Sequence, residues 1–82
     1  MAVVTLRYWA AAKDAAGVAE ETVTADTLAA ALAIADGNGR LSAVLSRSSF
    51  LIDGHPVGTR AADAVSLADG AVIEVLPPFA GG

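Results

Sequence analysis

The chain ends in the sequence AVIEVLPPFAGG, residues 71–82, and this stretch constrains how the rest of the fold can be arranged. The apolar and β-branched run at residues 71–76 predicts a strand. Pro77 and Pro78 end that strand, because neither residue can donate a backbone N–H to a neighbouring strand. The last four residues, 79–82, are therefore expected to leave the body of the protein from a firmly held root.

The end of the chain has the properties of a segment that enters a narrow site. Pro77 and Pro78 stiffen its stem, and Gly81 and Gly82 have no side chain to block the approach of another molecule. We therefore interpret the carboxylate of Gly82 as the reactive group of the protein. The alternative is a frayed chain end that happens to finish in glycine.

Short β-rich segments are distributed along the whole chain. They combine β-branched and apolar residues between turn residues, which is the pattern of strands. Val4 and Leu6 would share one face of the first strand, and the Asp53-Gly54 pair predicts a hairpin turn with Pro56 on its edge side. The strands are expected at residues 3–8, 21–24, 50–52, 55–57 and 71–76.

One substantial helix is predicted between the second and third strands. Asp26 is a suitable N-cap for a helix that begins at Thr27. An apolar stripe repeats at helical spacing until the sequence Asp-Gly-Asn-Gly at residues 36–39 ends the helix. The stripe consists of Leu28, Ala31, Leu32, Ile34 and Ala35. An alanine-rich turn or short helix is expected at residues 10–16, and a short helical piece at residues 41–45.

This order of elements predicts an α+β fold, with one main helix packed across a mixed sheet. It resembles the β-grasp fold of ubiquitin-like proteins, in which the first and last strands lie side by side and parallel at the centre of the sheet. We find no repeat, linker or domain boundary. Residues 1–82 are therefore expected to form a single domain from which residues 77–82 protrude as a tail.

The composition narrows the possible functions. The chain has 82 residues, no cysteine and a formal net charge of −4, so disulfides and thiolate metal sites are excluded. Its five basic residues are dispersed and form no patch for nucleic acid. No apolar run approaches the roughly 18 residues that span a membrane. The N-terminus lacks the pattern of a signal peptide, so a cytoplasmic location is expected.

Three segments together resemble a known family. They are Leu-Pro-Pro-Phe-Ala-Gly-Gly at residues 76–82, Arg-Tyr-Trp-Ala at residues 7–10 and Leu-Ala-Asp-Gly at residues 67–70. With them the chain resembles the sulfur carriers of the MoaD/ThiS type, and most closely the small, sulfur-carrier subunit of molybdopterin synthase. The two prolines before Gly-Gly are a mark of the molybdopterin branch, whereas the thiazole branch usually lacks them.

The resemblance implies a carrier that reacts only with its partners. An activating enzyme would use ATP to adenylate Gly82, and a sulfurtransferase donor would convert the adenylate to a thiocarboxylate. The tail, made of Pro77, Pro78, Phe79, Ala80 and Gly81 before Gly82, would then enter the large subunit of molybdopterin synthase within a heterotetramer. There the sulfur would pass to precursor Z to form the dithiolene of molybdopterin. The chain itself would be a non-catalytic subunit and would bind no cofactor or metal.

Four further residues are candidates for binding these partners. Phe79 is an aromatic residue on the tail and is interpreted as a docking anchor. Trp9 and Leu76 match family positions of an apolar contact surface at the root of the tail, although Trp9 could equally belong to the core. Lys13 matches a basic family position near the same surface, and its alternative is a solvated helix charge. His55 is interpreted as a turn residue.

The sequence leaves three other functions open. The chain could carry sulfur for thiazole or for another thiolated product, although the prolines count against thiazole. It could be a ubiquitin-like modifier that is joined to lysine side chains through Gly82. It could also be a β-grasp interaction module with an inert tail.

Overall fold

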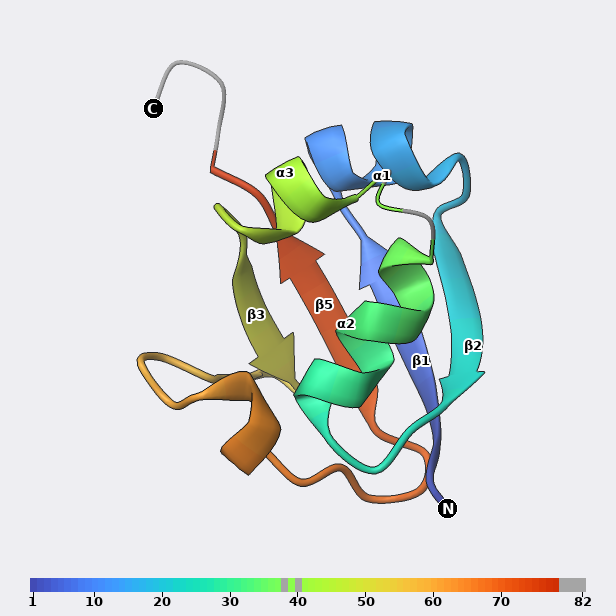
Figure 1. Ribbon diagram of the computed structural model, residues 1–82, viewed down its shortest axis with the longest axis vertical. Coiled ribbons are helices and arrows are strands. Elements are labelled where there is room, and N and C mark those ends of the chain that lie inside the picture. Colours follow the sequence, from blue (N-terminus) through green and yellow to red (C-terminus); the bar gives the residue numbers. More distant parts are fainter. Residues whose placement is uncertain (38, 40, 79–82) are drawn as a thin grey trace.

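The structure is a computed structural model and describes residues 1–37, 39 and 41–78. In this part of the chain, five strands form one sheet in the order β2-β1-β5-β3-β4. The strands are β1 (Val3–Tyr8), β2 (Glu20–Thr24), β3 (Ser49–Ile52), β4 (His55–Pro56) and β5 (Val72–Leu76). The helices are α1 (Ala10–Ala16), α2 (Leu28–Asp36), α3 (Ser42–Leu45) and the 3-10 helix η1 (Ala62–Ala64). Helix α2 lies across one face of the sheet (Figure 1).

The first and last strands are parallel neighbours at the centre of the sheet. Thr5 pairs with Val72 and Tyr8 with Val75, whereas β2 and β3 run antiparallel on the two outer sides. This is the mixed sheet predicted from the sequence. Because β1 and β5 point in the same direction, both strands end at the same end of the molecule, beside α1 and α3 (Figure 1).

The core lies between the sheet and the helices. Residues alternate between core and surface along β1, so Val4, Leu6 and Tyr8 are buried, and Val4 and Leu6 share one face as predicted. The hydroxyl of Tyr8 donates a hydrogen bond to Glu21 Oε2 at 2.6 Å. The remaining large, fully buried side chains are those of Leu28, Leu41, Ile73 and Val75.

The start of α2 differs from the prediction. Thr27, not Asp26, is the N-cap, and its Oγ1 accepts a hydrogen bond from the Ala30 N–H at 3.1 Å. Asp26 Oδ1 accepts instead from the Ala2 N–H at 2.8 Å and so holds the beginning of the chain. Both residue types can cap a helix, and the long-range partner of Asp26 decides between them.

The apolar stripe of α2 is narrower than predicted. Leu28, Ala31 and Ala35 are buried and Leu32 is half-buried, but Ile34 is 51% exposed. At 3.6 residues per turn, Ile34 lies about 60° around the helix from Ala31, beyond the edge of the buried stripe. Including Ile34 in the core was therefore wrong.

Smaller differences concern the ends of elements. Strands β2 and β3 each begin one residue earlier than predicted, while α3 and β5 each begin one residue later and β4 ends one residue earlier. The 3-10 helix η1 falls in a stretch that was predicted to be irregular. Shifts of one residue are within the normal fraying of element ends, so the predicted order of strands and helices is confirmed.

The hairpin at Asp53-Gly54 is confirmed. Asp53 has a φ of 51° and Gly54 a φ of 84°, and two successive positive values are those of a type I′ turn. Asp53 also holds the hairpin against β5, because its Oδ1 accepts a hydrogen bond from the Val72 N–H at 3.0 Å. His55 follows the turn and is exposed, as expected of a turn residue.

Candidate functional site at the root of the tail

The end of β5 and the end of β1 meet where the chain leaves the sheet. The Trp9 N–H donates a hydrogen bond to the Val75 carbonyl at 3.3 Å, which fastens the two strand ends together. Pro77 is buried and Pro78 is exposed, so the chain emerges from the body of the protein between the two prolines. The root of the tail is thus held by backbone contacts from the most central strands.

A small apolar hollow lies beside this root. It has a volume of about 240 Å³ and is lined by Trp9, Ala10, Leu76 and Pro77. Trp9 is 47% exposed and Leu76 is half-buried, so both present apolar surface to solvent. The structure therefore brings together two predicted partner-binding residues that lie near opposite ends of the chain, and it rules out a core position for Trp9.

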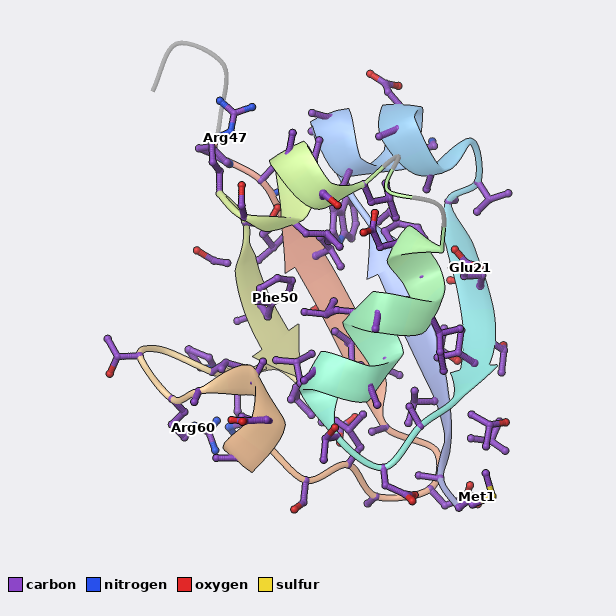
Figure 2. All side chains as sticks on the ribbon, viewed as in Figure 1. Met1, Glu21, Arg47, Phe50 and Arg60 are labelled. Carbon is purple, nitrogen blue, oxygen red and sulfur yellow. The ribbon has the colours of Figure 1, made fainter. Side chains whose placement is uncertain are left out.

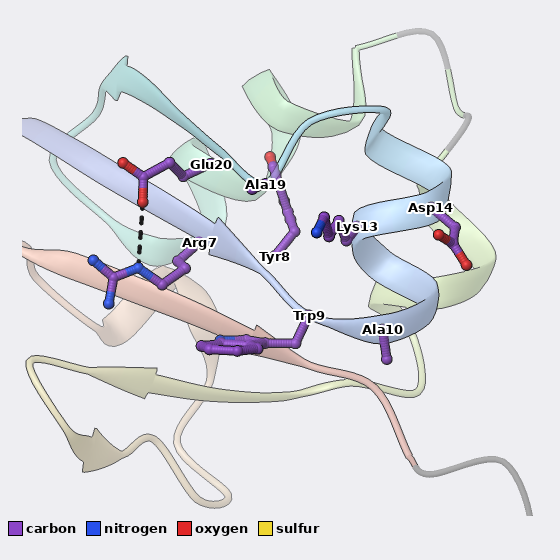
Figure 3. A pocket seen from close by; sticks show the side chains of 8 residues that line it. All are labelled: Arg7, Tyr8, Trp9, Ala10, Lys13, Asp14, Ala19 and Glu20. Carbon is purple, nitrogen blue, oxygen red and sulfur yellow. Dashed lines mark hydrogen bonds and ion pairs between the residues drawn. The ribbon is translucent and has the colours of Figure 1, made fainter.

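A second, larger hollow adjoins the first and shares Trp9 and Ala10 with it. Its volume is about 460 Å³, and its rim carries charged side chains (Figure 3). Arg7 Nε lies 3.4 Å from Glu20 Oε2 in an exposed ion pair. Lys13, on α1, also lines this hollow and is exposed. Among the described residues Lys13 has no ion-pair partner, so its charge is available to another group.

Ala10 turns the chain from β1 into α1 with an unusual backbone conformation. Trp9 is extended, with φ −120° and ψ 149°, and Ala10 follows with a φ of 48°. A non-glycine residue in this left-handed region costs about 1–2 kcal/mol. Strained residues of this kind often lie at binding sites, and this one lines both hollows. The sequence carried no signal for it, because alanine is not typical of positive φ.

Within the described residues, the main feature at this end of the molecule is the exposed apolar surface around Trp9 and Leu76. In residues 1–37, 39 and 41–78, no group of three or more His, Asp and Glu side chains is placed to hold a metal ion. The predicted reactive carboxylate of Gly82 lies outside the described residues, as do Phe79, Ala80 and Gly81. Within the described chain no helix is both long enough and apolar enough to cross a membrane.

Comparison with known families decides the affiliation of the chain. The model of the ThiS family matches residues 6–82, which include the strand β1 from Leu6 onward and the whole C-terminal segment. The chain belongs to the ThiS family. The resemblance to sulfur carriers of the MoaD/ThiS type is thereby confirmed. A sequence comparison with curated proteins gives no match.

Solved structures confirm the β-grasp fold of this ThiS-family chain. Small archaeal modifier protein 1 from Methanosarcina acetivorans is 23% identical with a TM-score of 0.86, over 100% of this chain and 98% of that one. A complex of subunits 1 and 2 of the molybdopterin-converting factor from Helicobacter pylori gives 24% identity and a TM-score of 0.73, over 98% and 99%. A putative molybdopterin converting factor subunit 1 from Pyrococcus furiosus is 19% identical with a TM-score of 0.79, over 96% of this chain and 100% of that one.

Proposed function

We propose that this chain is the sulfur-carrier subunit of a molybdopterin synthase. Gly82 is adenylated, converted to a thiocarboxylate and then donates its sulfur to precursor Z, which becomes the dithiolene of molybdopterin. Membership of the ThiS family supports a sulfur carrier. The Pro77-Pro78 stem favours the molybdopterin branch, and the Helicobacter pylori structure is a complex of two subunits of that pathway's converting factor.

The observation that carries this proposal is the apolar surface at the root of the tail. Trp9, Leu76 and the buried Pro77 surround the point where the chain leaves the sheet. A partner that receives the tail in its own active site must contact this surface at the same time. Exposed apolar side chains around such a point are the expected anchors of an interface, with Phe79 as a further anchor on the tail.

The chemistry of the proposed reaction explains the need for partners. A carboxylate is a poor electrophile, so its oxygen must first become part of a good leaving group, the AMP of an acyl-adenylate. A sulfur nucleophile can then displace AMP. Gly81 and Gly82 leave room for the nucleotide and for the sulfur donor, because neither has a Cβ. The activating enzyme supplies the contacts to ATP, and the sulfurtransferase supplies the sulfur.

The large subunit of the synthase and the activating enzyme use the same surface in this proposal. Each must bind the tail in an extended form, and each must therefore approach Trp9, Leu76 and Lys13. The two partners are expected to compete for one carrier molecule. The carrier would bind, discharge and leave, since two sulfur atoms are needed for each dithiolene.

A ubiquitin-like modifier is the second candidate function. The similarity to small archaeal modifier protein 1, with a TM-score of 0.86, supports this candidate. A modifier uses the same activated Gly82 but transfers it to the amine of a lysine on another protein. A carrier for a different thiolated product is the third candidate, and it differs only in the acceptor of the sulfur.

The test begins with the mass of the intact chain. After incubation with the activating enzyme, ATP and the sulfur donor, the chain should gain about 16 mass units, since sulfur replaces one oxygen at the acyl carbon. The loaded chain and the large subunit should then convert precursor Z to the dithiolene. Deleting Gly81-Gly82, or adding one residue after Gly82, should abolish both results while the circular dichroism spectrum stays unchanged.

The same experiment separates the candidates. A chain that gains sulfur but forms no dithiolene would point to another thiolated product. A chain recovered as isopeptide conjugates on other proteins, with no sulfur gained, would point to a modifier. Full dithiolene formation by an untrimmed chain with an added C-terminal residue would refute the role of Gly82.

A further inference from the structure

We propose that β2 pairs with the β2 of a second copy of this chain. The two five-stranded sheets then join edge to edge, antiparallel, around a two-fold axis. Strand β2 offers a regular free edge, and its two glutamates select one alignment of the copies. The inference does not depend on the proposed function, because it uses no residue of the tail.

Strand β2 is the first strand of the sheet and has a neighbouring strand only on the β1 side. The Ala19 carbonyl accepts a hydrogen bond from the Tyr8 N–H at 2.8 Å. The Ala25 N–H donates to the Ala2 carbonyl, also at 2.8 Å. Backbone groups alternate in direction along an antiparallel strand, so the odd-numbered residues of β2 face β1. The residues whose N–H and C=O face outward, with no backbone partner in the described part of the chain, are Glu20, Thr22 and Thr24.

This edge lacks the features that usually prevent the addition of another strand. Its register with β1 is continuous from Glu20 to Thr24, without a bulge. Its sequence, Glu-Glu-Thr-Val-Thr, contains neither lysine nor proline. A regular edge of this kind is a template for a further strand, because each outward N–H and C=O can find a partner there.

Helix α2 adds an exposed apolar side chain on the same side of the molecule. Asp36 accepts hydrogen bonds from the Leu41 N–H and the Ser42 hydroxyl, so its side chain faces α3. At about 100° per residue, Ile34 lies about 160° around the helix from Asp36. Ile34 therefore points away from α3, toward the side on which α2 contacts β2 (Figure 1). It is 51% exposed, so a second copy beside β2 also covers apolar surface.

The glutamates of β2 decide how the two copies align. Outward-facing residues must pair with each other, so the alignment can change only in steps of two residues. In the alignment centred on Thr22, all five residues of β2 are paired, and Glu20 lies opposite Thr24 of the second copy. A shift in one direction places the two copies of Glu21, and then those of Glu20, directly opposite each other, where like charges repel. A shift in the other direction leaves Glu20 and Glu21 without partners on the second strand.

The homodimer is weak and reversible. Each copy contributes the five residues of β2 and a few neighbours, whereas a stable interface uses roughly 20–30 residues per side. Two chains of net charge −4 also repel each other. Its Kd is therefore expected on the order of 0.1–1 mM, in the range of transient contacts. Because the copies are antiparallel, their β5 strands point in opposite directions, and the two tails leave from opposite ends of the dimer.

The test uses the complete chain alone over a series of concentrations. Sedimentation equilibrium from about 20 µM to about 2 mM should show the mean mass rising from that of one chain toward that of two. Amide exchange followed by NMR locates the contact. Exchange at Thr22 and Thr24 should slow about twofold when half of the chains are paired, because these amides then exchange only in the monomer. The Val23 amide faces β1 and should show no dependence on concentration.

Charge variants at position 24 test both the alignment and the identity of the partner. Thr24→Lys places an opposite charge against Glu20 of the second copy at two symmetric positions, which should lower the Kd about 2- to 30-fold. Thr24→Glu places like charges there and should raise the Kd by a similar factor. Thr59→Lys is the matched control, because it changes the net charge equally but adjoins Arg60, on the side of the molecule away from Glu21 (Figure 2). Its Kd should change less than about twofold, since a distant exposed charge is screened by salt.

A further variant removes the central N–H of the edge. Thr22→Pro leaves pairing with β1 intact, because proline is tolerated where the N–H faces outward, and the folded variant should stay monomeric. Circular dichroism checks its fold, and the variants at position 24 carry the test if it does not fold. A monomer at all concentrations would overturn the inference and leave the edge to a strand of another protein. Equal effects of Thr24→Lys and Thr24→Glu, or unchanged exchange at Thr22 in a dimer, would also overturn it.

Discussion

Replacing Trp9 with alanine should weaken the binding of both partners. Trp9 is 47% exposed at the root of the tail, and its backbone contacts do not depend on its side chain. A tryptophan side chain covers up to about 250 Å², so about 100 Å² remains for a partner to bury. At about 25 cal/mol per Å² this area is worth up to about 2.5 kcal/mol. We expect a loss of about 1–2.5 kcal/mol, because part of the gain is spent on ordering the interface.

The measurement is a calorimetric titration of the carrier into the large subunit and, separately, into the activating enzyme. The expected loss corresponds to a Kd raised roughly 5- to 60-fold. Val3→Ala is the matched control, because Val3 is also an apolar residue of 47% exposure but lies at the start of β1. Its binding free energy should change by less than about 0.5 kcal/mol, as for most surface substitutions away from a site.

Both variants must be shown to be folded, since the buried half of Trp9 also stabilises the protein itself. Thermal unfolding followed by circular dichroism supplies this check at the temperature of the titration. Unchanged affinity of a folded Trp9→Ala variant for both partners would refute the docking surface. Equal losses of affinity for Val3→Ala and Trp9→Ala would refute the location of the docking surface at the root of the tail.

Three further changes test separate parts of the argument. Ala10→Gly should raise the free energy of unfolding by about 0.5–1 kcal/mol, because glycine adopts a φ of 48° without strain. Ala11→Gly within α1 is the control and should lower the free energy of unfolding by a similar amount. Denaturant unfolding measures both. Asp53→Ala should lower the free energy of unfolding by about 1–2 kcal/mol, because the Val72 N–H loses its acceptor and alanine disfavours positive φ. An unchanged unfolding midpoint would contradict this. Phe79→Ala should weaken binding of the large subunit by roughly 1–3 kcal/mol with little change in Tm, and a large drop in Tm would instead make Phe79 a core residue.

Much of the fold could be predicted because its signals are local. Alternation of Val4 and Leu6 in β1, and the Asp53-Gly54 turn between two apolar runs, each depend on neighbouring residues. The errors lie where a distant contact competes with a local preference. Ile34 has the right residue type for the core, and only the position of the sheet beneath α2 leaves it exposed.

The sequence alone determined the order of strands and helices, the stiff Pro77-Pro78 stem and the family to which the chain belongs, since these depend on local periodicity, turn chemistry and motif. The tertiary structure decided which groups meet. Asp26 binds the Ala2 N–H, 24 residues away, and so leaves the helix cap to Thr27. Parallel pairing of β1 with β5 brings Trp9 beside Leu76 at the root of the tail. Such contacts join residues far apart in the chain, and no local pattern of residues encodes the distance between them.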